Sequence, residues 1–330
     1  MFHSETDDRY SLEQRQEPYP TSGERRNMDD QIQQWHWPDD YVSFDNGLLH
    51  VRPDCVGAFK QLRWTTLDSV MNSDQVKIIR TLEARDNCVL QVDTVHGPVR
   101  AFLKRHRVRS LDDWRRERRA RRAGDTPGMA EAAAVGWCRQ AGIPTVNIIA
   151  CGQRTDNGKF WQSDSFFLSE ELTGSIPACD LWHDSGISDE ARSRAIIAIA
   201  RTARHFHAAD LFHYDFYLDH FFVNTQQLAV PDIPVTATLM DLQRVERVSS
   251  SFARWRSGVK DLGQFYGSCQ YHGVNEQDWN LWVRHYFGVS ELDGIDLSQR
   301  NSVRLTAAVA RWELRQWRRR IQSQIRRRAA

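Results

Sequence analysis

The sequence has 330 residues, of which 41% are hydrophobic and 26% charged, and its formal net charge is +1 at pH 7. This length and apolar content suit one large domain or two lobe-sized domains, and they exclude a disordered chain. The near-zero net charge excludes a strong global field, so any preference for anionic partners must come from local clusters of charge.

The six cysteines are scattered without a Cys-x-x-Cys pair, and the N-terminus lacks a basic-then-apolar signal pattern. We therefore expect reduced thiols in a cytoplasmic protein. Charges or turn residues interrupt every apolar run before it reaches the roughly 18–20 residues that span a bilayer. We expect that the chain does not cross a membrane.

Residues 1–37 mix acidic, basic and amide side chains with little apolar periodicity, which predicts a disordered leader. We expect an N-lobe over residues 38–172. Apolar runs at 76–79, 88–92 and 99–104 are separated by polar turns. They predict three antiparallel strands in a meander.

A helix is predicted over Ala130–Gln140, closed by Ala141-Gly142, because glycine suits the left-handed position after a helix. Residues 146–151 and 165–170 then predict two more strands around a polar turn. The expected N-lobe therefore has five strands and one main helix, and it ends at residue 172.

The remainder, residues 173–330, is expected to form a mostly helical C-lobe. Ser188 can cap a helix with an apolar stripe that ends at Phe206. A polar loop over 213–223 follows, and then a short strand that ends at Asp241. Residues 302–327 predict a basic amphipathic helix that either packs on this lobe or lies at a bilayer interface. These elements predict an α+β fold with two lobes, a sheet-rich N-lobe and a helical C-lobe.

Phosphoryl transfer requires a cation on the nucleotide phosphates, a partner that orients this cation, a metal ligand, and a carboxylate beside the acceptor hydroxyl. The chain offers all four groups. Lys104 ends the third predicted strand and Glu131 lies in the next helix. Asp215, in a His-x-Asp loop, is the candidate for accepting the hydroxyl proton, and Asp241 is the candidate magnesium ligand. His220 stands where protein kinases have asparagine, and it suits a contact with phosphate or with Asp215.

A zinc site is a competing interpretation of the same region. Histidines at these spacings could converge on one metal ion, although they lack a matching cysteine pair or a His-Glu-x-x-His helix. The candidate ligands would be His205, His207, His213 and His220.

Between residues 75 and 268 the chain resembles the lipopolysaccharide core heptose kinases, an outlying branch of the protein-kinase-like superfamily. Six segments carry the resemblance: Phe102-Leu103-Lys104-Arg105-His106, Ala130-Glu131-Ala132 with 141–145, 169–173, His213-x-Asp215-x-Tyr217-x-x-His220-Phe221, Asp241-Leu242-Gln243-Arg244 and Lys260-Asp261-Leu262. Tyr217 and His220 favour a heptose acceptor, because the related Kdo kinases keep an asparagine in the loop.

The resemblance implies ATP and Mg²⁺ as cofactors, and phosphorylation of a heptose hydroxyl of the lipopolysaccharide inner core at the cytoplasmic face of the inner membrane. It implies that Asp215 is the catalytic residue and that Asp241 is the metal ligand. The nucleotide-binding residues that it implies are Lys104, Glu131, Glu170, Leu172 and His220. Two alternatives stay open: transfer to another acceptor, such as Kdo, a small molecule or a protein, and a catalytically dead binding module.

The chain departs from ordinary kinases in two respects. No Gly-x-Gly-x-x-Gly lies between the first two predicted strands, where 83–87 form the expected turn, so Arg85 or backbone amides must cover the phosphates. Residues 100–122 hold eleven Lys or Arg against three acids. This cluster suits a phosphorylated glycolipid or anionic headgroups, or it is a solvated helix face. We expect no nucleic-acid partner, since no recognition motif accompanies the charge.

Overall fold

The computed structural model describes residues 41–82, 84–117, 126–155, 161–288, 306–312 and 315. The predicted leader, residues 1–37, lies outside the described residues. The strands of the described part are β1 (Val42–Phe44), β2 (Leu49–Val51), β3 (Lys77–Leu82), β4 (Arg85–Thr94), β5 (Gly97–Val108), β6 (Ile148–Thr155), β7 (Ser163–Glu170), β8 (Ser175–Pro177), β9 (Leu211–Phe212), β10 (Phe221–Asn224), β11 (Ala237–Leu239) and β12 (Glu246–Arg247).

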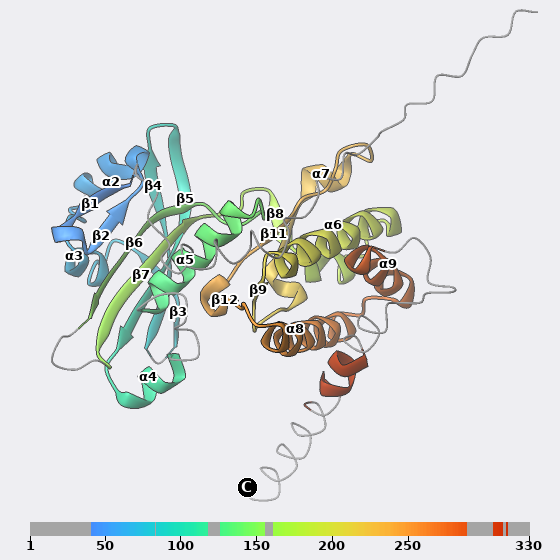
Figure 1. Cartoon of the computed structure of the whole chain (residues 1–330). Coiled ribbons are helices and arrows are strands. Elements are labelled where there is room, and N and C mark those ends of the chain that lie inside the picture. Colours follow the sequence, from blue (N-terminus) through green and yellow to red (C-terminus); the bar gives the residue numbers. More distant parts are fainter. Residues whose placement is uncertain are drawn as a thin grey trace, which may run out of the picture. The chain divides into compact units, whose positions relative to one another are not determined.

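The α-helices of this part are α2 (Val56–Gln61), α3 (Leu67–Met71), α4 (Leu111–Glu117), α5 (Pro127–Gln140), α6 (Asp189–Ala208), α7 (Thr225–Ala229), α8 (Ser251–Tyr271) and α9 (Glu276–Phe287). Short 3-10 helices are η1 (Asp45–Gly47), η2 (Pro53–Cys55), η4 (Ala178–Trp182), η5 (Leu218–His220) and η6 (Leu242–Arg244). A further helical segment covers 306–312. Figure 1 shows these elements in chain order.

The first half is built on one antiparallel sheet with the strand order β1-β2-β6-β7-β5-β4-β3. The predicted meander is confirmed as β3, β4 and β5, which pair in sequence. The predicted total of five strands is wrong, because β1 and β2 extend the sheet to seven. These strands have three residues each, too few for a periodic signal, and β2 pairs with β6 about 100 positions away, with Val51 opposite Ala150.

Two features of the first strands also differ from expectation. The predicted turn over 83–87 is shorter, because Arg85 already belongs to β4 and pairs with Leu82. The lobe contains small helices beside its main one: α2 and α3 bring Phe59 and Leu67 into a core that they share with the sheet. Both side chains are fully buried.

Helix α5 lies against the sheet and carries Glu131. Its predicted end is confirmed: Ala141 caps it, and Gly142 follows at φ +69°, a conformation that glycine adopts without steric cost. At its beginning, a Cβ on Gly128 would lie 2.8 Å from the Phe166 backbone of β7. The absent side chain lets the helix approach the sheet this closely, and this distance fixes the position of Glu131.

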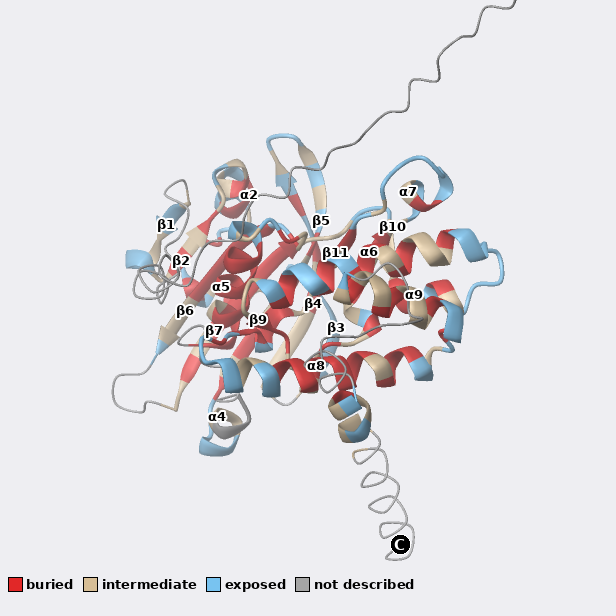
Figure 2. Cartoon of the chain, turned by 45° about the vertical axis from the view of Figure 1, so that its right-hand side comes forward, coloured by how far each residue is buried: buried red, intermediate tan, exposed pale blue. Residues whose placement is uncertain are grey.

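The second half is mainly helical, as predicted. Ser188 caps α6 by accepting a hydrogen bond from the Ala191 N–H, and the apolar stripe of this helix is buried. Helix α6 packs against α9, and red buried positions run along α6 and α8 in Figure 2. The core beside the 213–223 loop is aromatic: the ring centroids of Phe216 and Phe221 are 5.3 Å apart, and those of Phe265 and Trp282 are 4.8 Å apart.

One contact joins the segment after α5 to β11. The Leu239 N–H donates to the Pro144 carbonyl at 2.9 Å, and the Thr145 hydroxyl donates to the Leu239 carbonyl at the same distance. Because β11 ends just before Asp241, these bonds hold that carboxylate next to the sheet and α5.

Other sequence expectations can now be placed. All six cysteines are buried and free of disulfides. In the described residues, no helix combines the length and hydropathy that a bilayer span requires. Of the predicted terminal helix 302–327, the described part is helical at 306–312 and 315, and Ala308 is fully buried there.

Candidate active site

Three predicted residues meet in direct contact. The Lys104 ammonium, on β5, donates to Glu131 Oε1 of α5 at 2.7 Å and to Asp241 Oδ1 at 2.6 Å. Glu131 is almost fully buried, whereas 36% of the Asp241 side chain is exposed. An ammonium has three N–H donors, so the third remains available for a ligand oxygen.

This contact fixes the charges of the group. The neighbouring ammonium of Lys104 holds the pKa of Asp241 well below its usual range. The pKa of Lys104 lies above its usual range, because the two carboxylates outweigh the effect of burial. Burial raises the pKa of Glu131, and Lys104 opposes this shift. Around neutral pH, Asp241 is therefore an anion and Lys104 a cation.

The backbone at Asp241 is in the left-handed region, at φ 58° and ψ 53°. Such a conformation costs an aspartate of the order of 1–2 kcal/mol, so the surroundings must impose it. One support is His213, whose Nε2 lies 3.1 Å from the Met240 carbonyl. Burial and the nearby His220 lower the pKa of His213 to about 4, so the ring is neutral at pH 7 and donates its Nε2 proton to this carbonyl.

The loop that carries Asp215 is anchored by Asp261 of α8. The Asp261 carboxylate accepts hydrogen bonds from the backbone N–H of His213 at 2.6 Å and of Tyr214 at 2.8 Å. Asp261 is fully buried, and Tyr214 has a left-handed φ of 62°. The two charge-assisted bonds hold the turn that presents Asp215.

Asp261→Asn is expected to lower the free energy of unfolding by about 1–3 kcal/mol, because its amide group would face one of these buried N–H donors. Chemical denaturation measures the change. The matched variant Asp74→Asn, at an exposed position, should change stability by less than about 0.5 kcal/mol. Equal stability of the two variants would contradict the anchoring role.

The Asp215 carboxylate itself is paired with Arg244. The Arg244 guanidinium lies 3.0 Å from the carboxylate, and one quarter of the Asp215 side chain is exposed. Burial raises the pKa of Asp215, and the positive charges of Arg244 and Lys260 oppose this shift. The negative charge of Asp241 also raises this pKa, so the two carboxylates lie within electrostatic range of each other.

His220 lies beside both acids without bonding to the Asp215 side chain. Its Nδ1 is 2.7 Å from the Asp215 backbone carbonyl, and its Nε2 is 3.7 Å from Asp241 Oδ2. The ring stacks on His213, with centroids 5.4 Å apart. Because Nδ1–H donates to the carbonyl, Nε2 is the nitrogen that faces the Asp241 carboxylate.

Glu170 and Leu172 lie at the end of β7, apart from this cluster. Glu170 accepts a hydrogen bond from Arg52 at 2.6 Å and another from Asn147 at 2.8 Å. Among the described residues, none accepts a hydrogen bond from the Leu172 backbone N–H. A backbone N–H donor is the kind of group that a nucleobase edge requires, so the predicted role of Leu172 stays a prediction.

The histidine set of the zinc interpretation is divided. His205 is exposed on α6, whereas the neighbouring His207 is buried between Tyr286 and Asp261. In the described part of the chain, one group of potential ligands gathers tightly enough for a metal ion, and it consists of Cys179, Asp219 and His272. The predicted zinc ligands are not among them.

The basic segment 100–122 is less available than its composition indicates. Arg105 is buried and donates to the Ser73 carbonyl at 2.8 Å. Arg107 pairs with Asp86 at 2.6 Å, Arg109 pairs with Asp164 at 2.5 Å, and Arg100 pairs with Glu171. The described arginines of β5 therefore have intramolecular partners, which weakens the predicted local field; residues 118–125 lie outside the described part.

Sequence reasoning did not assign a function to Asp261, Arg244 or Lys260. All three stand in motifs that carried the family resemblance, but their local pattern does not reveal a role. A carboxylate at 261 within the apolar run Val259, Leu262 and Phe265 signals a buried acid that needs donors.

A comparison with protein-family models matches residues 69–286 to the lipopolysaccharide kinase (Kdo/WaaP) family. The lipopolysaccharide core heptose(I) kinase WaaP of Pseudomonas aeruginosa is 27% identical over 242 residues, which cover 69% of this chain and 84% of the relative. The enzyme of the same name from Escherichia coli is 26% identical over 189 residues, which cover 56% of this chain and 69% of the relative.

A solved structure, WaaP in complex with acyl carrier protein, resembles this fold with a TM-score of 0.55 at 22% identity. The match covers 81% of this chain and 97% of the solved one. At this identity the likeness establishes the fold alone.

Proposed function

The chain belongs to the lipopolysaccharide kinase (Kdo/WaaP) family, and on this premise we propose that it transfers the γ-phosphoryl group of ATP to a heptose hydroxyl of the lipopolysaccharide inner core. It is a phosphotransferase with a sugar hydroxyl as acceptor, built on a kinase-like fold. The proposal concerns the particular acceptor, the metal and the roles of the individual residues.

The observation that carries the proposal is the double contact of Lys104 with Glu131 and Asp241. In kinases, a strand lysine oriented by a helix glutamate binds the nucleotide phosphates, and an aspartate beyond the catalytic loop holds magnesium. Here Lys104 of β5, Glu131 of α5 and Asp241 supply the same three chemical groups, and they lie in direct contact. Lys104 would bind the phosphates with its third N–H, and Glu131 would keep it in place.

The donor set suits Mg²⁺. This ion prefers oxygen ligands and is usually held by one or two carboxylates together with substrate phosphates and water. Asp241 offers an ionised carboxylate whose Oδ2 is 3.7 Å from the nearest nitrogen of His220. When bound, the metal supplies positive charge that stabilises the charge developing on the phosphoryl oxygens. Asp241 is the residue proposed to hold it.

Asp215 is proposed to orient the acceptor hydroxyl and to accept its proton. The backbone N–H bonds of His213 and Tyr214 to Asp261 hold the loop that carries Asp215. The Asp215 carboxylate pairs with Arg244 and is partly exposed, so a hydroxyl can approach it. Its raised pKa makes it a stronger proton acceptor than an ordinary aspartate. His220 would hold the loop through the Asp215 carbonyl and could contact a phosphate with Nε2. Leu172 and Glu170 would lie along the nucleobase.

The names of the relatives support heptose as the acceptor, since the matched enzymes of both organisms are called core heptose(I) kinases. Tyr217 and His220 of the loop agree with this choice. Because the acceptor is a lipid-anchored sugar and ATP is available in the cytoplasm, we propose that the reaction occurs at the cytoplasmic face of the inner membrane. Kdo remains the second candidate acceptor.

The pH dependence of turnover tests the assignment of Asp215. Activity should fall as the pH drops through the raised pKa of this carboxyl, since the protonated form cannot accept a proton. Removing the positive charge in Arg244→Gln should raise this pKa further and move the acidic limb of the kcat profile to higher pH. The pKa of Glu131 is also raised, but Arg244 is not among the groups that shift it. An acidic limb set by Glu131 should therefore stay at the same pH in Arg244→Gln. An unmoved limb, or one at lower pH, would contradict the assignment.

The acceptor is tested by ATP consumption with four substrates: heptose-containing core, free heptose, a Kdo acceptor without heptose, and a generic protein. We expect turnover with the heptose-containing core and, more weakly, with free heptose. Turnover on the Kdo acceptor or the protein alone would overturn the heptose assignment while leaving the phosphotransferase activity intact.

A further inference from the structure

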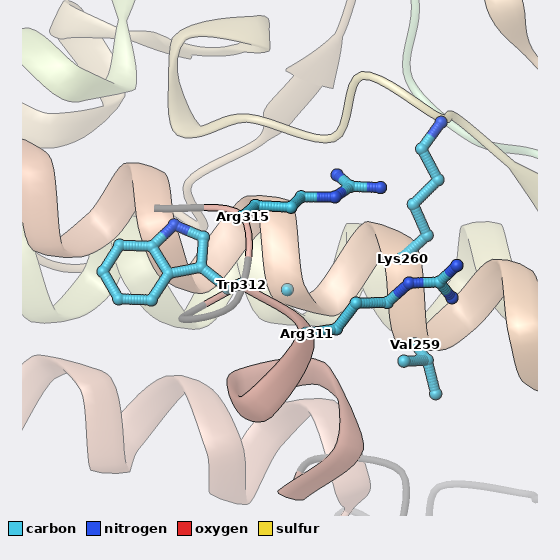
Figure 3. A pocket seen from close by; sticks show the side chains of 6 residues that line it. Val259, Lys260, Arg311, Trp312 and Arg315 are labelled. Atoms are coloured by element: carbon cyan, nitrogen blue, oxygen red, sulfur yellow. The ribbon is translucent and has the colours of Figure 1, made fainter. Parts of the chain in front are cut away.

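A small pocket lies between α8 and the helical residues 306–312. It is partly open to solvent, and it is lined by Val259, Lys260, Gly263, Arg311, Trp312 and Arg315. Three of the six lining residues are cations and none is an acid. Figure 3 shows Arg311 and Arg315 extending in the same direction, towards Lys260 and Val259 of α8.

Close packing fixes the wall of the pocket. A Cβ on Gly263 would lie 2.6 Å from the Ala308 carbonyl oxygen, and a Cβ on Gly267 would lie 1.6 Å from Trp312 Nε1. The two glycines are one helical turn apart, so they form a seam on which the terminal helix rests. The ring of Trp312 also packs edge-on against Tyr266, with centroids 5.6 Å apart. Arg311 and Arg315 are one turn apart as well, and both line the pocket together with Lys260.

The cations of this pocket lack acidic partners in the described residues: no carboxylate there lies within ion-pair distance of Lys260, Arg311 or Arg315. Burial, with the positive charges of Arg315 and Arg244, lowers the pKa of Lys260 to about 8, although Asp261 and Asp215 oppose this. Burial, Arg315 and Arg256 likewise lower the pKa of Arg311. Arg311 and Arg315 thus repel each other, whereas Asp261 and Asp215 attract Lys260 more strongly than Arg315 repels it. A bound anion would relieve the repulsion between the two arginines.

The pocket adjoins the acceptor side of the candidate active site. The Lys260 ammonium lies over the Tyr214 ring, 4.4 Å from its centroid, and Tyr214 directly precedes Asp215. Lys260 is also among the positive charges that act on the Asp215 carboxylate. A group bound by Lys260 would therefore belong to a molecule that also reaches Asp215.

We propose that Lys260, Arg311 and Arg315 form an anion-binding subsite that receives a carboxylate or phosphate group carried by the acceptor glycolipid. Two guanidinium groups and an ammonium match the planar oxygens of a carboxylate or the oxygens of a phosphate. The subsite would position the sugar so that its hydroxyl lies beside Asp215. This inference rests on the proposed function, because it assumes a sugar acceptor at that carboxylate.

The test uses the double variant Arg311→Gln/Arg315→Gln and a water-soluble, deacylated core acceptor in two forms. One form keeps its carboxylates and phosphates; in the other the phosphates are removed and the carboxyls methyl-esterified. We expect the wild type to prefer the anionic form at least about tenfold in kcat/KM, the size of one lost charge-assisted contact. The double variant should lose this preference through a higher acceptor KM, with its kcat and its KM for ATP within about twofold of the wild type.

The matched control is Arg201→Gln, an exposed arginine on α6, which should keep the preference. Equal use of both acceptors by the wild type would overturn the subsite and leave the proposed function intact. Turnover of neither acceptor would instead count against the proposed function itself. A double variant that loses activity equally on both forms, with an unchanged melting temperature, would also overturn the subsite.

A vesicle experiment separates the acceptor from the membrane as the source of the anion. The wild type and the double variant are compared for binding to vesicles with anionic phospholipids. If the double variant loses vesicle binding but keeps the preference for the anionic soluble acceptor, the pocket binds bilayer headgroups and the proposal is wrong. Unchanged vesicle binding together with the lost preference supports it.

Discussion

Asp241→Asn is expected to lower kcat by about a thousandfold or more. The carboxylate is the proposed magnesium ligand, and a metal contributes several kcal/mol to stabilising the transition state, at 1.36 kcal/mol for each tenfold change in rate. Asparagine keeps the shape of the side chain but removes the charge that lies 2.6 Å from Lys104. Steady-state turnover measured over a range of Mg²⁺ concentrations tests the expectation, since the variant should also need more magnesium.

The control for this variant is Asp232→Asn, an exposed aspartate in the segment before β11. It should keep kcat within about twofold of the wild type. A variant at position 241 with normal turnover and normal magnesium dependence would remove Asp241 from the metal site. A melting temperature close to that of the wild type is required for either conclusion.

Asp215→Asn is expected to lower kcat by about a hundredfold to ten-thousandfold, the usual contribution of a positioned general base. Affinity for ATP should change little, because the nucleotide ligands Lys104 and Asp241 are untouched. Single-turnover transfer measures the chemical step, and nucleotide binding is measured separately by calorimetry. The asparagine can still hydrogen-bond the hydroxyl, so the residual rate reports how much of the effect is orientation.

Asp189→Asn provides the comparison, since this aspartate begins α6 and its side chain is 93% exposed. It should leave both measurements unchanged. If Asp215→Asn kept the wild-type transfer rate, Asp215 would not be the general base. If the wild type showed no transfer and Asp215→Asn kept its biological activity, the fold would be serving as a binding module without catalysis. A loss of ATP affinity equal to the loss of turnover would mean that Asp215 acts on the nucleotide instead.

Most elements of the fold could be predicted because their signals are local. The strands β3, β4 and β5 alternate with clear turns, and Ala141-Gly142 marks the end of α5. Ser188 and the apolar stripe that ends at Phe206 define α6 in the same way. In each case the chain within about ten residues determines the element, so periodicity and capping are sufficient.

The additional strands escaped prediction because long-range pairing stabilises them. Strand β1 is largely exposed and has three residues, so its sequence alone favours no structure. Strand β2 forms a strand because β6, about 100 positions later, presents a free edge. The small helices α2 and α3 likewise depend on burying Phe59 and Leu67 against the sheet.

The pairing of Lys104 with Glu131 could be predicted from the order of the kinase pattern, whereas the contacts that support the rest of the candidate site could not. Lys104 and Asp241 are 137 positions apart, and only the order of a known kinase pattern indicates that they meet. The position of the Asp215 loop depends on Asp261, which looks like any acid in a helix until its two N–H partners are placed. The effect of Arg244 and Lys260 on the Asp215 carboxylate could not be predicted either, because it arises only after three segments of the chain fold together.

The position of the transferred phosphate tests the central claim most directly. Purified protein is incubated with ATP, Mg²⁺ and heptose-containing core, and tandem mass spectrometry with ³¹P NMR then locates the new phosphoryl group. We predict a phosphate on a heptose hydroxyl with the wild type and, in the same incubation time, at most about one hundredth as much with Asp215→Asn. A phosphate found on Kdo or on protein, or released only as inorganic phosphate, would contradict the claim.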